Sequence, residues 1–458
     1  MTSWVPHTEQ ETAEMLEQIG LSSLDELFEV IPAALRLAGG LAMEDGIPEP
    51  EVLDHFADLA AGNTPVGRDL ICFAGAGAYD HEAPAVTRAL ASRSELVTAY
   101  TPYQAEVAQG VLQALFEYQT MVARLAGLDV ANASLYDGAH ALVEGVNLAS
   151  AATGRRSVWV SEGVNPRWLQ CLATASRGTR QDSDVRLVPL DPCTGATSWP
   201  ELEPPGDGGD LPGAVVVANP NYLGCLEEMD RAAGVAGACG AELIVVFDPV
   251  CAGIISSPGA YGASIAVGEG QALGAPLSFG GPYLGLFACA MRHVRRIPGR
   301  IVGQTIDTDA KTAYVTTLRA REQDIRRERA SSNVCTNETL LAVGAAIQMA
   351  WLGTSGLAEI ALRSARGTRY CRDALLSIPG VEPMTTAPAL REIAVRTPVT
   401  GETIVERMID DGFLAGVPLT LGAAPSGFEG GLLVAVTERR TRAEIDSYAA
   451  AFEKAARP

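Results

Sequence analysis

A glycine-rich stretch, residues 267–285, constrains this chain more than any other feature. It contains six glycines and two prolines, so its backbone suits tight turns and close approach to other groups. It follows Asp248, which comes directly after the apolar run of residues 243–247. Such a run predicts a buried parallel strand, and an aspartate just after it lies where open α/β sheets bind ligands. We therefore expect the chemistry of the chain to lie around Asp248.

Length, composition and charge exclude several classes of protein. With 458 residues, 47% of them hydrophobic, the chain can bury a sizeable core and is predicted to form two or three domains. No apolar run approaches ~18 residues, so we expect no transmembrane helix. The net charge of −21 argues against a nucleic-acid-binding protein, which would carry a basic face.

Two further features bear on where the protein works. The first basic residue is Arg36, so we expect neither a secretory signal nor a transit peptide. The nine cysteines are odd in number and contain no Cys-x-x-Cys pair. This pattern favours reduced thiols in a cytoplasmic protein, and we predict no metal site.

Helical and extended patterns alternate through the middle of the chain. Apolar runs at 158–160, 185–188, 214–217 and 243–247 predict strands, and a helical periodicity covers 107–125. The alternation indicates a mostly parallel sheet with helices on both faces. We predict an N-terminal helical arm over 1–65, a large domain over 66–337 and a smaller C-terminal α/β domain over 338–458.

Two polar segments outside the glycine-rich stretch are candidates for binding. Tyr100 and Tyr103 flank Thr-Pro in an extended turn that ends at Gln104. An arginine-dense segment, 318–329, predicts a helix with i,i+4 ion pairs, and it leads into a small polar loop over 330–337. The loop carries neutral donors that suit a phosphate or carboxylate; these donors are Ser331, Ser332, Asn333 and Thr336.

The pattern around Asp248 resembles that of enzymes which use pyridoxal phosphate (PLP) on an aminotransferase-like fold. In that class the aspartate would hold the pyridinium nitrogen, and a lysine roughly twenty residues further along the chain would form a Schiff base. Here Gln271 stands in the lysine position, and the chain has only two lysines, Lys311 and Lys454. The helix that begins after Tyr136 could hold a phosphate at its first turn. We therefore predict a vestigial pocket formed by Tyr136, Asp248 and Gln271.

Several motifs in one order resemble the P-protein of the glycine cleavage system, and the resemblance covers nearly the whole chain. They include Ala-Tyr-Thr-Pro-Tyr-Gln at 99–104 and Pro-Gly-Arg-Ile-Val-Gly at 298–303. The chain is most similar to the subunit 1 type, the N-terminal half in organisms whose P-protein is split in two. The other matching segments are 112–121, 136–138, 268–285 and 320–329.

The resemblance implies a fold, an activity and partners. The fold would be α/β, a PLP-dependent transferase of fold type I. The P-protein, a glycine dehydrogenase, decarboxylates glycine on PLP and passes the aminomethyl group to the lipoyl arm of the H-protein. This subunit would lack the Schiff-base lysine, and subunit 2 would bind the PLP. Two copies of each subunit would form a heterotetramer in which this chain lends residues across the interface. No nucleic acid or membrane partner is implied.

Two other functions remain open on the sequence. A self-sufficient PLP enzyme would need Lys311, but the aspartates beside it, at 307 and 309, stabilise a protonated ammonium rather than a nucleophile. A non-catalytic binding or regulatory protein on the same fold would need no lysine. A bound chromophore distinguishes the first function, and complementation by a lysine-bearing partner distinguishes the second.

Overall fold

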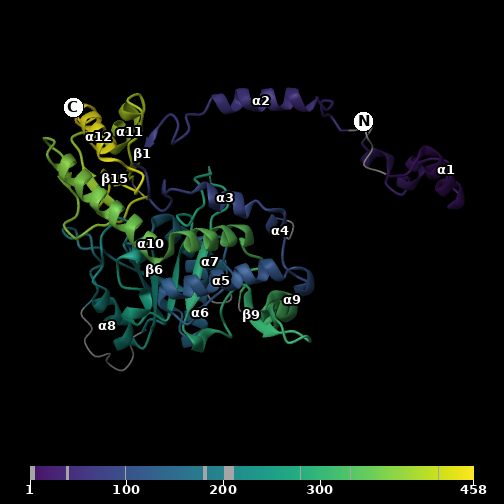
Figure 1. The fold of residues 1–458 in the computed structure, drawn as a ribbon, viewed down its shortest axis with the longest axis horizontal. Coiled ribbons are helices and arrows are strands. Elements are labelled where there is room, and N and C mark those ends of the chain that lie inside the picture. Colours follow the sequence, from purple (N-terminus) through teal and green to yellow (C-terminus); the bar gives the residue numbers. More distant parts are fainter. Residues whose placement is uncertain are drawn as a thin grey trace. The chain divides into compact units, whose positions relative to one another are not determined.

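The structure is a computed structural model that describes residues 6–37, 41–97, 100–178, 183–200, 211–278, 280–330, 332–420 and 422–458 (Figure 1). The chain divides into two compact units, Met1–Thr64 and Pro65–Pro458. The first unit contains two α-helices, α1 (Glu9–Gln18) and α2 (Glu49–Ala61). A capping box starts α1, in which Thr8 and Glu11 exchange hydrogen bonds between side chains and backbone.

A seven-stranded sheet forms the centre of the second unit. Within the described residues its strand order is β2-β8-β7-β6-β5-β3-β4. Strands β3 to β7 run parallel, whereas β8 is antiparallel to both of its neighbours. The strands are β2 (Val130–Ala131), β3 (Ser157–Ser161), β4 (Asp184–Val188), β5 (Ala214–Asn219), β6 (Glu242–Phe247), β7 (Ile265–Glu269) and β8 (Gly285–Cys289). The four strands predicted from the sequence are therefore β3, β4, β5 and β6.

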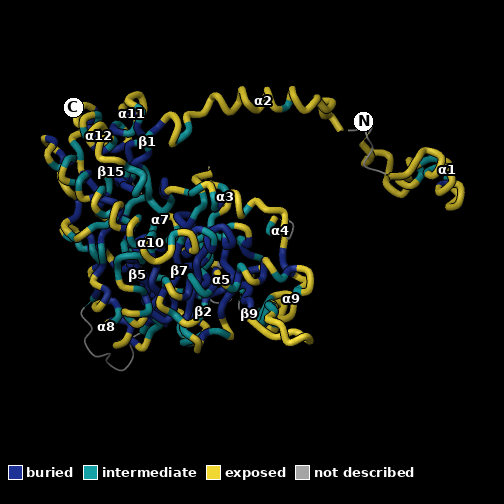
Figure 2. The backbone as a smooth tube through the Cα atoms, in the orientation of Figure 1, coloured by how far each residue is buried: buried dark blue, intermediate teal, exposed yellow. Residues whose placement is uncertain are grey.

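Helices cover both faces of this sheet because successive strand residues point to opposite sides. Along β6, Leu243 and Val245 enter one core cluster, whereas Ile244 and Val246 enter the other. The first cluster includes residues of α5 (Gln109–Ala126), α8 (Met229–Cys239) and α10 (Thr339–Leu376). The second includes residues of α6 (Gly138–Thr153) and α7 (Pro166–Gly178). Both cores are dark blue in Figure 2. This arrangement confirms the predicted fold class.

Local signals set the ends of the helices nearest the site. Helix α5 ends at Gly127, which follows the periodic stretch and has a left-handed φ of 65° that glycine adopts without strain. Helix α6 begins at Asp137, whose side chain accepts a hydrogen bond from the backbone N–H of His140. This cap fixes the direction in which the first turn of α6 points.

A second, four-stranded sheet lies near the C-terminus, with described strands in the order β11-β12-β15-β14. Helices α10, α11 and α12 pack with it. The elements are β11 (Glu382–Pro383), β12 (Glu392–Arg396), α11 (Gly401–Ile409), β14 (Val417–Pro418), β15 (Leu432–Ala435) and α12 (Arg442–Ala455). Short β1 (Ile71–Cys72) pairs with β13 (Phe413–Leu414) beside it. The domain boundary at residue 338 stays a prediction.

Helix α10 connects the two sheets. Its Ala342 and Ala345 belong to the core of the large sheet, and its Cys371 and Leu375 belong to the core of the small sheet. Among the described residues it is the one helix whose length and apolar composition would suffice to span a membrane. Part of this helix is buried in the two protein cores, and a backbone break at Gly353, with φ of 61° and ψ of −174°, divides it into two halves.

The arginine-dense segment differs from its prediction. Three short pieces replace the expected helix: η7 (Arg319–Arg321), α9 (Gln323–Arg326) and η8 (Arg327–Arg329). Leu318 and Arg327 have φ of 56° and 50°, which a continuous right-handed helix excludes. The segment follows the antiparallel hairpin of β9 (Ile301–Ile306) and β10 (Thr312–Thr317).

Gly224 joins the loop after β5 to the small sheet, and its replacement should be costly. Its φ is +82°, and an added Cβ would lie 2.0 Å from the backbone oxygen of Glu392. We expect Gly224→Ala to lower the free energy of unfolding by about 2–5 kcal/mol, from left-handed strain plus the clash. Gly427 is the control because its φ is +85° but an added Cβ would meet open space. Chemical denaturation that gives equal losses for both variants would contradict this account.

Candidate functional site

Asp248 and Gln271 line one pocket at the carboxyl ends of β6 and β7. Asp248 directly follows β6, and Gln271 comes two residues after β7. The pocket has a volume of about 80 Å³. Residues from several loops and from the first turn of α7 complete its wall: Tyr79, Asn165, Trp168, Asn221, Tyr222 and Arg391. The carboxyl edge of an open parallel sheet is the usual ligand position of α/β proteins.

Gln271 is a fully engaged structural residue in this pocket. Its side-chain N–H groups donate to the backbone oxygens of Tyr79, at 3.1 Å, and Ala275, at 2.8 Å. Its side-chain oxygen accepts a hydrogen bond from the N–H of Tyr79 at 2.9 Å. Because the amide is 1% exposed, these bonds satisfy a group that would be costly to bury alone. Gln271 therefore ties the glycine-rich stretch to the loop after β1.

Asp248 already has partners for both of its carboxylate oxygens. One oxygen accepts hydrogen bonds from the N–H groups of Val250, at 2.8 Å, and Cys251, at 2.9 Å. The other forms a buried ion pair with the guanidinium of Arg391, which precedes β12 of the small sheet. Burial is the largest single influence and lowers the pKa of Arg391, but Asp248 together with the other negative groups nearby raises it overall.

Further contacts hold the Arg391 guanidinium in place. It stacks on the ring of Tyr79, with Cζ 3.4 Å from the ring centroid. Its Nη1 lies 2.9 Å from Nε2 of His81, whose Nδ1 is 2.6 Å from a carboxylate oxygen of Glu438. If the imidazole donates from Nδ1 to Glu438, its Nε2 is free to accept from Arg391. A side chain of the small sheet thus fills the space beside Asp248.

Glu269, the last residue of β7, occupies the start of helix α6. One of its oxygens accepts a hydrogen bond from the N–H of Gly138 at 2.9 Å. The other accepts from the N–H groups of Gln271, at 2.9 Å, and Leu284, at 3.0 Å. Burial raises the pKa of this carboxyl to about 7, although the three N–H donors act in the opposite direction. With the Asp137 cap, two carboxyl groups occupy the first turn of α6.

The structure brings together the two polar segments that the sequence singled out, and Arg300 joins them. Its Nη1 donates to the hydroxyl of Thr101, at 3.4 Å, and to that of Thr336, at 3.3 Å. Its Nη2 donates to the backbone oxygen of Cys335 at 3.0 Å, and its guanidinium lies over the ring of Tyr103. Tyr103 and Thr336, far apart in the sequence, are therefore neighbours.

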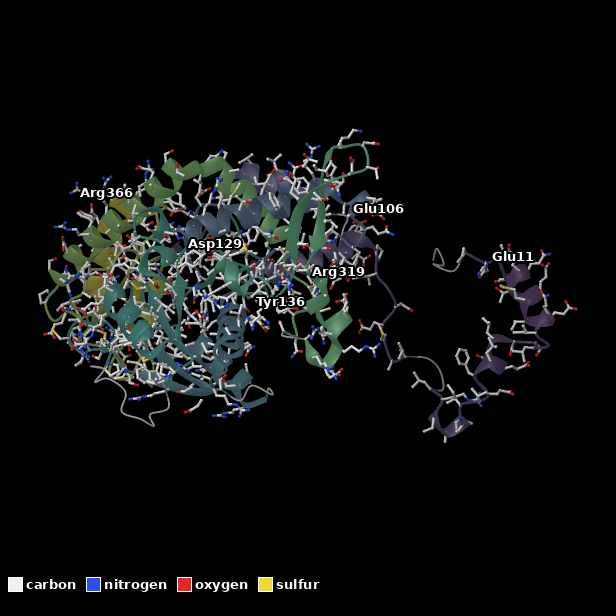
Figure 3. All side chains as sticks on the ribbon, turned by 90° about the horizontal axis from the view of Figure 1, so that it is seen from below. Glu11, Glu106, Asp129, Tyr136, Arg319 and Arg366 are labelled. Carbon is white, nitrogen blue, oxygen red and sulfur yellow. The ribbon has the colours of Figure 1, made fainter. Side chains whose placement is uncertain are left out.

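Tyr136 lies with this second group rather than in the pocket of Asp248. Its hydroxyl accepts hydrogen bonds from the N–H groups of Cys335, at 3.2 Å, and Thr336, at 3.5 Å. It is absent from the lining of the pocket that holds Asp248 and Gln271. Figure 3 labels Tyr136, and it also labels Arg319 of the arginine-dense segment. The predicted grouping of Tyr136 with Asp248 and Gln271 differs from this placement.

The remaining predicted residues lie on the loop that follows the arginine-dense segment or on the turn near residue 100. Ser332 accepts a hydrogen bond from the N–H of Val334 at 3.1 Å, and Asn333 is exposed. Ser331 lies outside the described residues. The side chains of Tyr100 and Tyr103 are 75% and 60% exposed. These two aromatic side chains, exposed beside a loop of neutral donors, are available to a second protein or a ligand.

Neither lysine lines the pocket of Asp248. Lys311 is exposed in the turn between β9 and β10, where its ammonium lies 3.5 Å from a carboxylate oxygen of Asp309. Lys454 pairs with Asp411 on the small sheet side at 3.0 Å. The pocket therefore has no amine that could form an imine.

Sequence reasoning missed two charged residues that line the pocket, Arg391 and Glu269. Both had a local signal. Arg391 stands with Glu392 directly before the apolar strand residues 393–395, and Glu269 stands between two glycines at the end of a buried strand. A charge at a buried position is uncommon unless it is paired. No signal in the sequence identified their partners.

The strand order, the single reversed strand β8 and the pocket at the carboxyl edge define the class of protein. Solved structures with this fold include a NifS-like protein, with a TM-score of 0.60 at 13% identity over 84% of this chain and 98% of that chain. Another is an alanine–glyoxylate aminotransferase from Nostoc sp., with a TM-score of 0.58 at 15% identity over 86% and 97%. The fold is therefore that of the PLP-dependent transferases of fold type I.

Closer similarity fixes the family within this class. The family model of the glycine cleavage system P-protein matches residues 2–452. A probable glycine dehydrogenase (decarboxylating) subunit 1 of Moorella thermoacetica is 44% identical over 450 residues, 98% of this chain and 99% of that protein. An inhibitor-bound crystal structure of glycine decarboxylase (P-protein) covers 99% of this chain and 100% of that chain, with a TM-score of 0.90 at 41% identity. The chain belongs to the glycine cleavage system P-protein family.

The pocket of this chain does not fit the PLP of its class. Gln271 has no amine for a Schiff base, and Arg391 holds the Asp248 oxygen that a pyridinium nitrogen would need. At the start of α6, the carboxyls of Asp137 and Glu269 oppose a phosphate dianion. Each of the three attachment points of the cofactor is therefore absent or occupied by the protein itself.

Glu144 of helix α6 gives this region a predictable pH dependence. Burial raises its pKa to about 7, although hydrogen bonds from Ser332 and Asn147 lower it. Because the folded value exceeds the usual 4.5, deprotonation costs stability as the pH rises from about 4.5 to about 7. We expect Glu144→Gln to gain up to about 3 kcal/mol in free energy of unfolding relative to the wild type above about pH 7, and little near pH 4.

Urea denaturation across this pH range measures the difference between the wild type and Glu144→Gln. The exposed Glu382 provides the matched control, because Glu382→Gln removes a carboxylate without removing a buried charge. A constant difference between wild type and Glu144→Gln from pH 4 to pH 8 would contradict the assignment.

Proposed function

We propose that this chain is the non-lysine subunit of a heteromeric P-protein, in which it completes an active site held by its partner. The partner, subunit 2, binds PLP through a lysine, and the assembled enzyme decarboxylates glycine and passes the aminomethyl group to the lipoyl arm of the H-protein. Two copies of each subunit form the heterotetramer. The observation that carries the proposal is the pocket of this chain, where Arg391 and Glu269 occupy the groups that a cofactor would need.

The groups that line the pocket support our proposal that the partner binds the cofactor. When bound, PLP supplies the electron sink for the carbanion that decarboxylation leaves. In this chain Gln271 is committed to the backbone at residues 79 and 275, and Asp248 is committed to Arg391. The charged groups of the pocket therefore stabilise the fold, and the contribution of this chain to the reaction comes from another surface.

Exposed apolar side chains support an interface beside the second group of polar residues. Val107 is 78% exposed on a turn that contacts β10, and Val315 of β10 is 38% exposed. On the paired strand β9, Ile306 is 70% exposed. Such a concentration of apolar surface marks a protein contact. Tyr100 and Tyr103, on the turn before Val107, would then be carried to the partner.

The neutral donors on this surface suit an anionic site shared between two chains. Ser332, Asn333 and Thr336 can donate to a phosphate or carboxylate without adding a charge that is costly to bury, and Ser331, outside the described residues, joins them on the sequence alone. The phenols of Tyr100 and Tyr103 can bound a small pocket that takes glycine and admits a lipoyl thiol. We assign these six residues the role of holding and orienting groups in the partner's site.

The first test concerns the cofactor of the isolated chain. We expect the purified chain to take up no PLP covalently, because no lysine lines the pocket, and to show no imine absorbance band. Gln271→Lys should also fail to acquire that band, since Arg391 and Glu269 still fill the places of the ring and phosphate. A borohydride-sensitive band that maps to Lys311 would instead establish the self-sufficient enzyme and overturn the proposal.

The second test concerns the residues lent across the interface. In the assembled enzyme, Tyr100→Phe, Tyr103→Phe and Thr336→Ala should each lower the glycine decarboxylation rate while the complex elutes at its normal size. A lost hydrogen bond to a charged group is worth roughly 1.5–3 kcal/mol, or about ten- to a hundredfold in rate if it acts in the transition state.

Tyr261→Phe is the matched control for these variants, because Tyr261 lies in the turn before β7 and not on the proposed surface. If all three surface substitutions leave the rate unchanged, the chain is a scaffold only. If the chain binds no lysine-bearing partner, it acts as a separate binding or regulatory protein.

A further inference from the structure

Arg300 is a buried arginine that forms no short ion pair with a described carboxylate; Glu322, across the same pocket, attracts it only at longer range. Its residue is 9% exposed, and in the described part of the chain it has no Asp or Glu oxygen within 4.0 Å. Its hydrogen-bond partners are all neutral: the hydroxyls of Thr101 and Thr336, the side-chain oxygen of Asn337 at 3.4 Å, and a backbone oxygen. Arg391 is the contrast, because it is equally buried but paired with Asp248.

This lack of a close counter-ion has a cost. A buried charge is expensive unless it is paired, and neutral acceptors compensate it only in part. The guanidinium also lies 5.5 Å from the ring centroid of Tyr103, a face that attracts cations without removing their charge. The free chain therefore keeps a preformed site for an anion at Arg300.

A pocket of about 240 Å³ lies directly beside this guanidinium. Besides Arg300 and Tyr103 it is lined by one further cation and two carboxyls: Arg319, Glu322 and Asp324. Arg319 and Asp324 form an ion pair at 2.8 Å and so neutralise each other. Glu322 is left facing the pocket with one oxygen that has no hydrogen-bond partner, and burial raises its pKa.

We propose that Arg300 binds an oxyanion of the reaction in this pocket, either the carboxylate of glycine or the phosphate of PLP held by the partner subunit. The inference rests on the proposed function. It identifies Arg300 as the positively charged group of the shared site. Arginine suits this role because its planar fork can bind two oxygens of a carboxylate or phosphate at once.

The same contacts make Arg300 a positioning residue for the two lent segments. One guanidinium holds Thr101, next to Tyr100, and Thr336 in the polar loop. An oxyanion bound by the Arg300 guanidinium would therefore lie close to both the tyrosines and the neutral donors. Glu322 acts against the oxyanion, so removal of its charge should strengthen binding while removal of the Arg300 charge should weaken it.

The experiment uses the assembled enzyme with Arg300→Gln, Arg300→Lys and Glu322→Gln, and with Arg296→Gln as the matched control. Arg296 is exposed in the same turn. Three quantities are measured: the size of the complex, the KM and kcat for glycine, and the Kd for PLP from absorbance titration of the apo-assembly. Titration reports cofactor binding without any dependence on turnover.

Arg300→Gln should raise either the KM for glycine or the Kd for PLP by about tenfold or more. This is the change expected when a hydrogen bond to a charged group is lost. A change in KM alone assigns the carboxylate, and a change in the PLP Kd alone assigns the phosphate. Arg300→Lys should lie between wild type and Arg300→Gln because it keeps the charge but loses the fork. Glu322→Gln should lower the affected constant, an effect that a purely structural Arg300 does not produce, and Arg296→Gln should leave both unchanged.

Two results would overturn the inference. In one, Arg300→Gln assembles with both constants unchanged; in the other, Arg300→Lys is as impaired as Arg300→Gln and Glu322→Gln has no effect. If Thr336→Ala and Tyr103→Phe still slow decarboxylation in those cases, the proposed function stands and the oxyanion site alone fails. If those two variants are also without effect, the shared active site itself is wrong.

Discussion

The buried ion pair between Asp248 and Arg391 is the interaction on which the rest of the second unit depends. Asp248 ends a central strand of the large sheet, and Arg391 precedes a strand of the small sheet, so one contact joins both sheets. Loss of one partner of such a pair typically costs 3–5 kcal/mol because the other charge stays buried. Tyr79, His81 and Glu438 extend the contact into a continuous set of buried polar groups.

Much of the fold could be predicted because its signals are local. The apolar runs became strands β3 to β6, and the glycine at 127 ended helix α5 where the periodicity stopped. The arginine-dense segment failed because helical spacing of charges does not reveal the left-handed residues Leu318 and Arg327. Backbone conformation at such residues depends on what the segment packs against, which spacing does not encode.

The candidate site residues differ in the same way: some have a local signal in the sequence, and others are brought in by long-range contacts. Asp248 and Gln271 follow predicted strands, so their shared pocket could be anticipated from the sheet edge alone. Arg391 reaches that pocket from 143 residues away in sequence, and Arg300 joins segments near 101 and 336. Contacts of that sequence separation come from the tertiary arrangement of loops, where no periodicity operates. The sequence pattern identified Asp248 and Gln271 as positions where cofactor chemistry was expected. The structure shows that Arg391 and backbone groups already engage these two side chains.

Helix α10 has a mechanical consequence when it is considered together with the pocket of Asp248. Its first half is part of the large-sheet core and its second half is part of the small-sheet core. The backbone breaks between these halves at Gly353, where φ is 61° and ψ is −174°, so α10 by itself does not hold the two sheets at a fixed angle. The Arg391 bridge and the Tyr79–Gln271 bonds supply further contacts between the same two regions. A rotation of one sheet against the other, as in a hinge motion, would have to break these buried polar contacts. The pocket therefore acts as a latch between the two halves of the second unit.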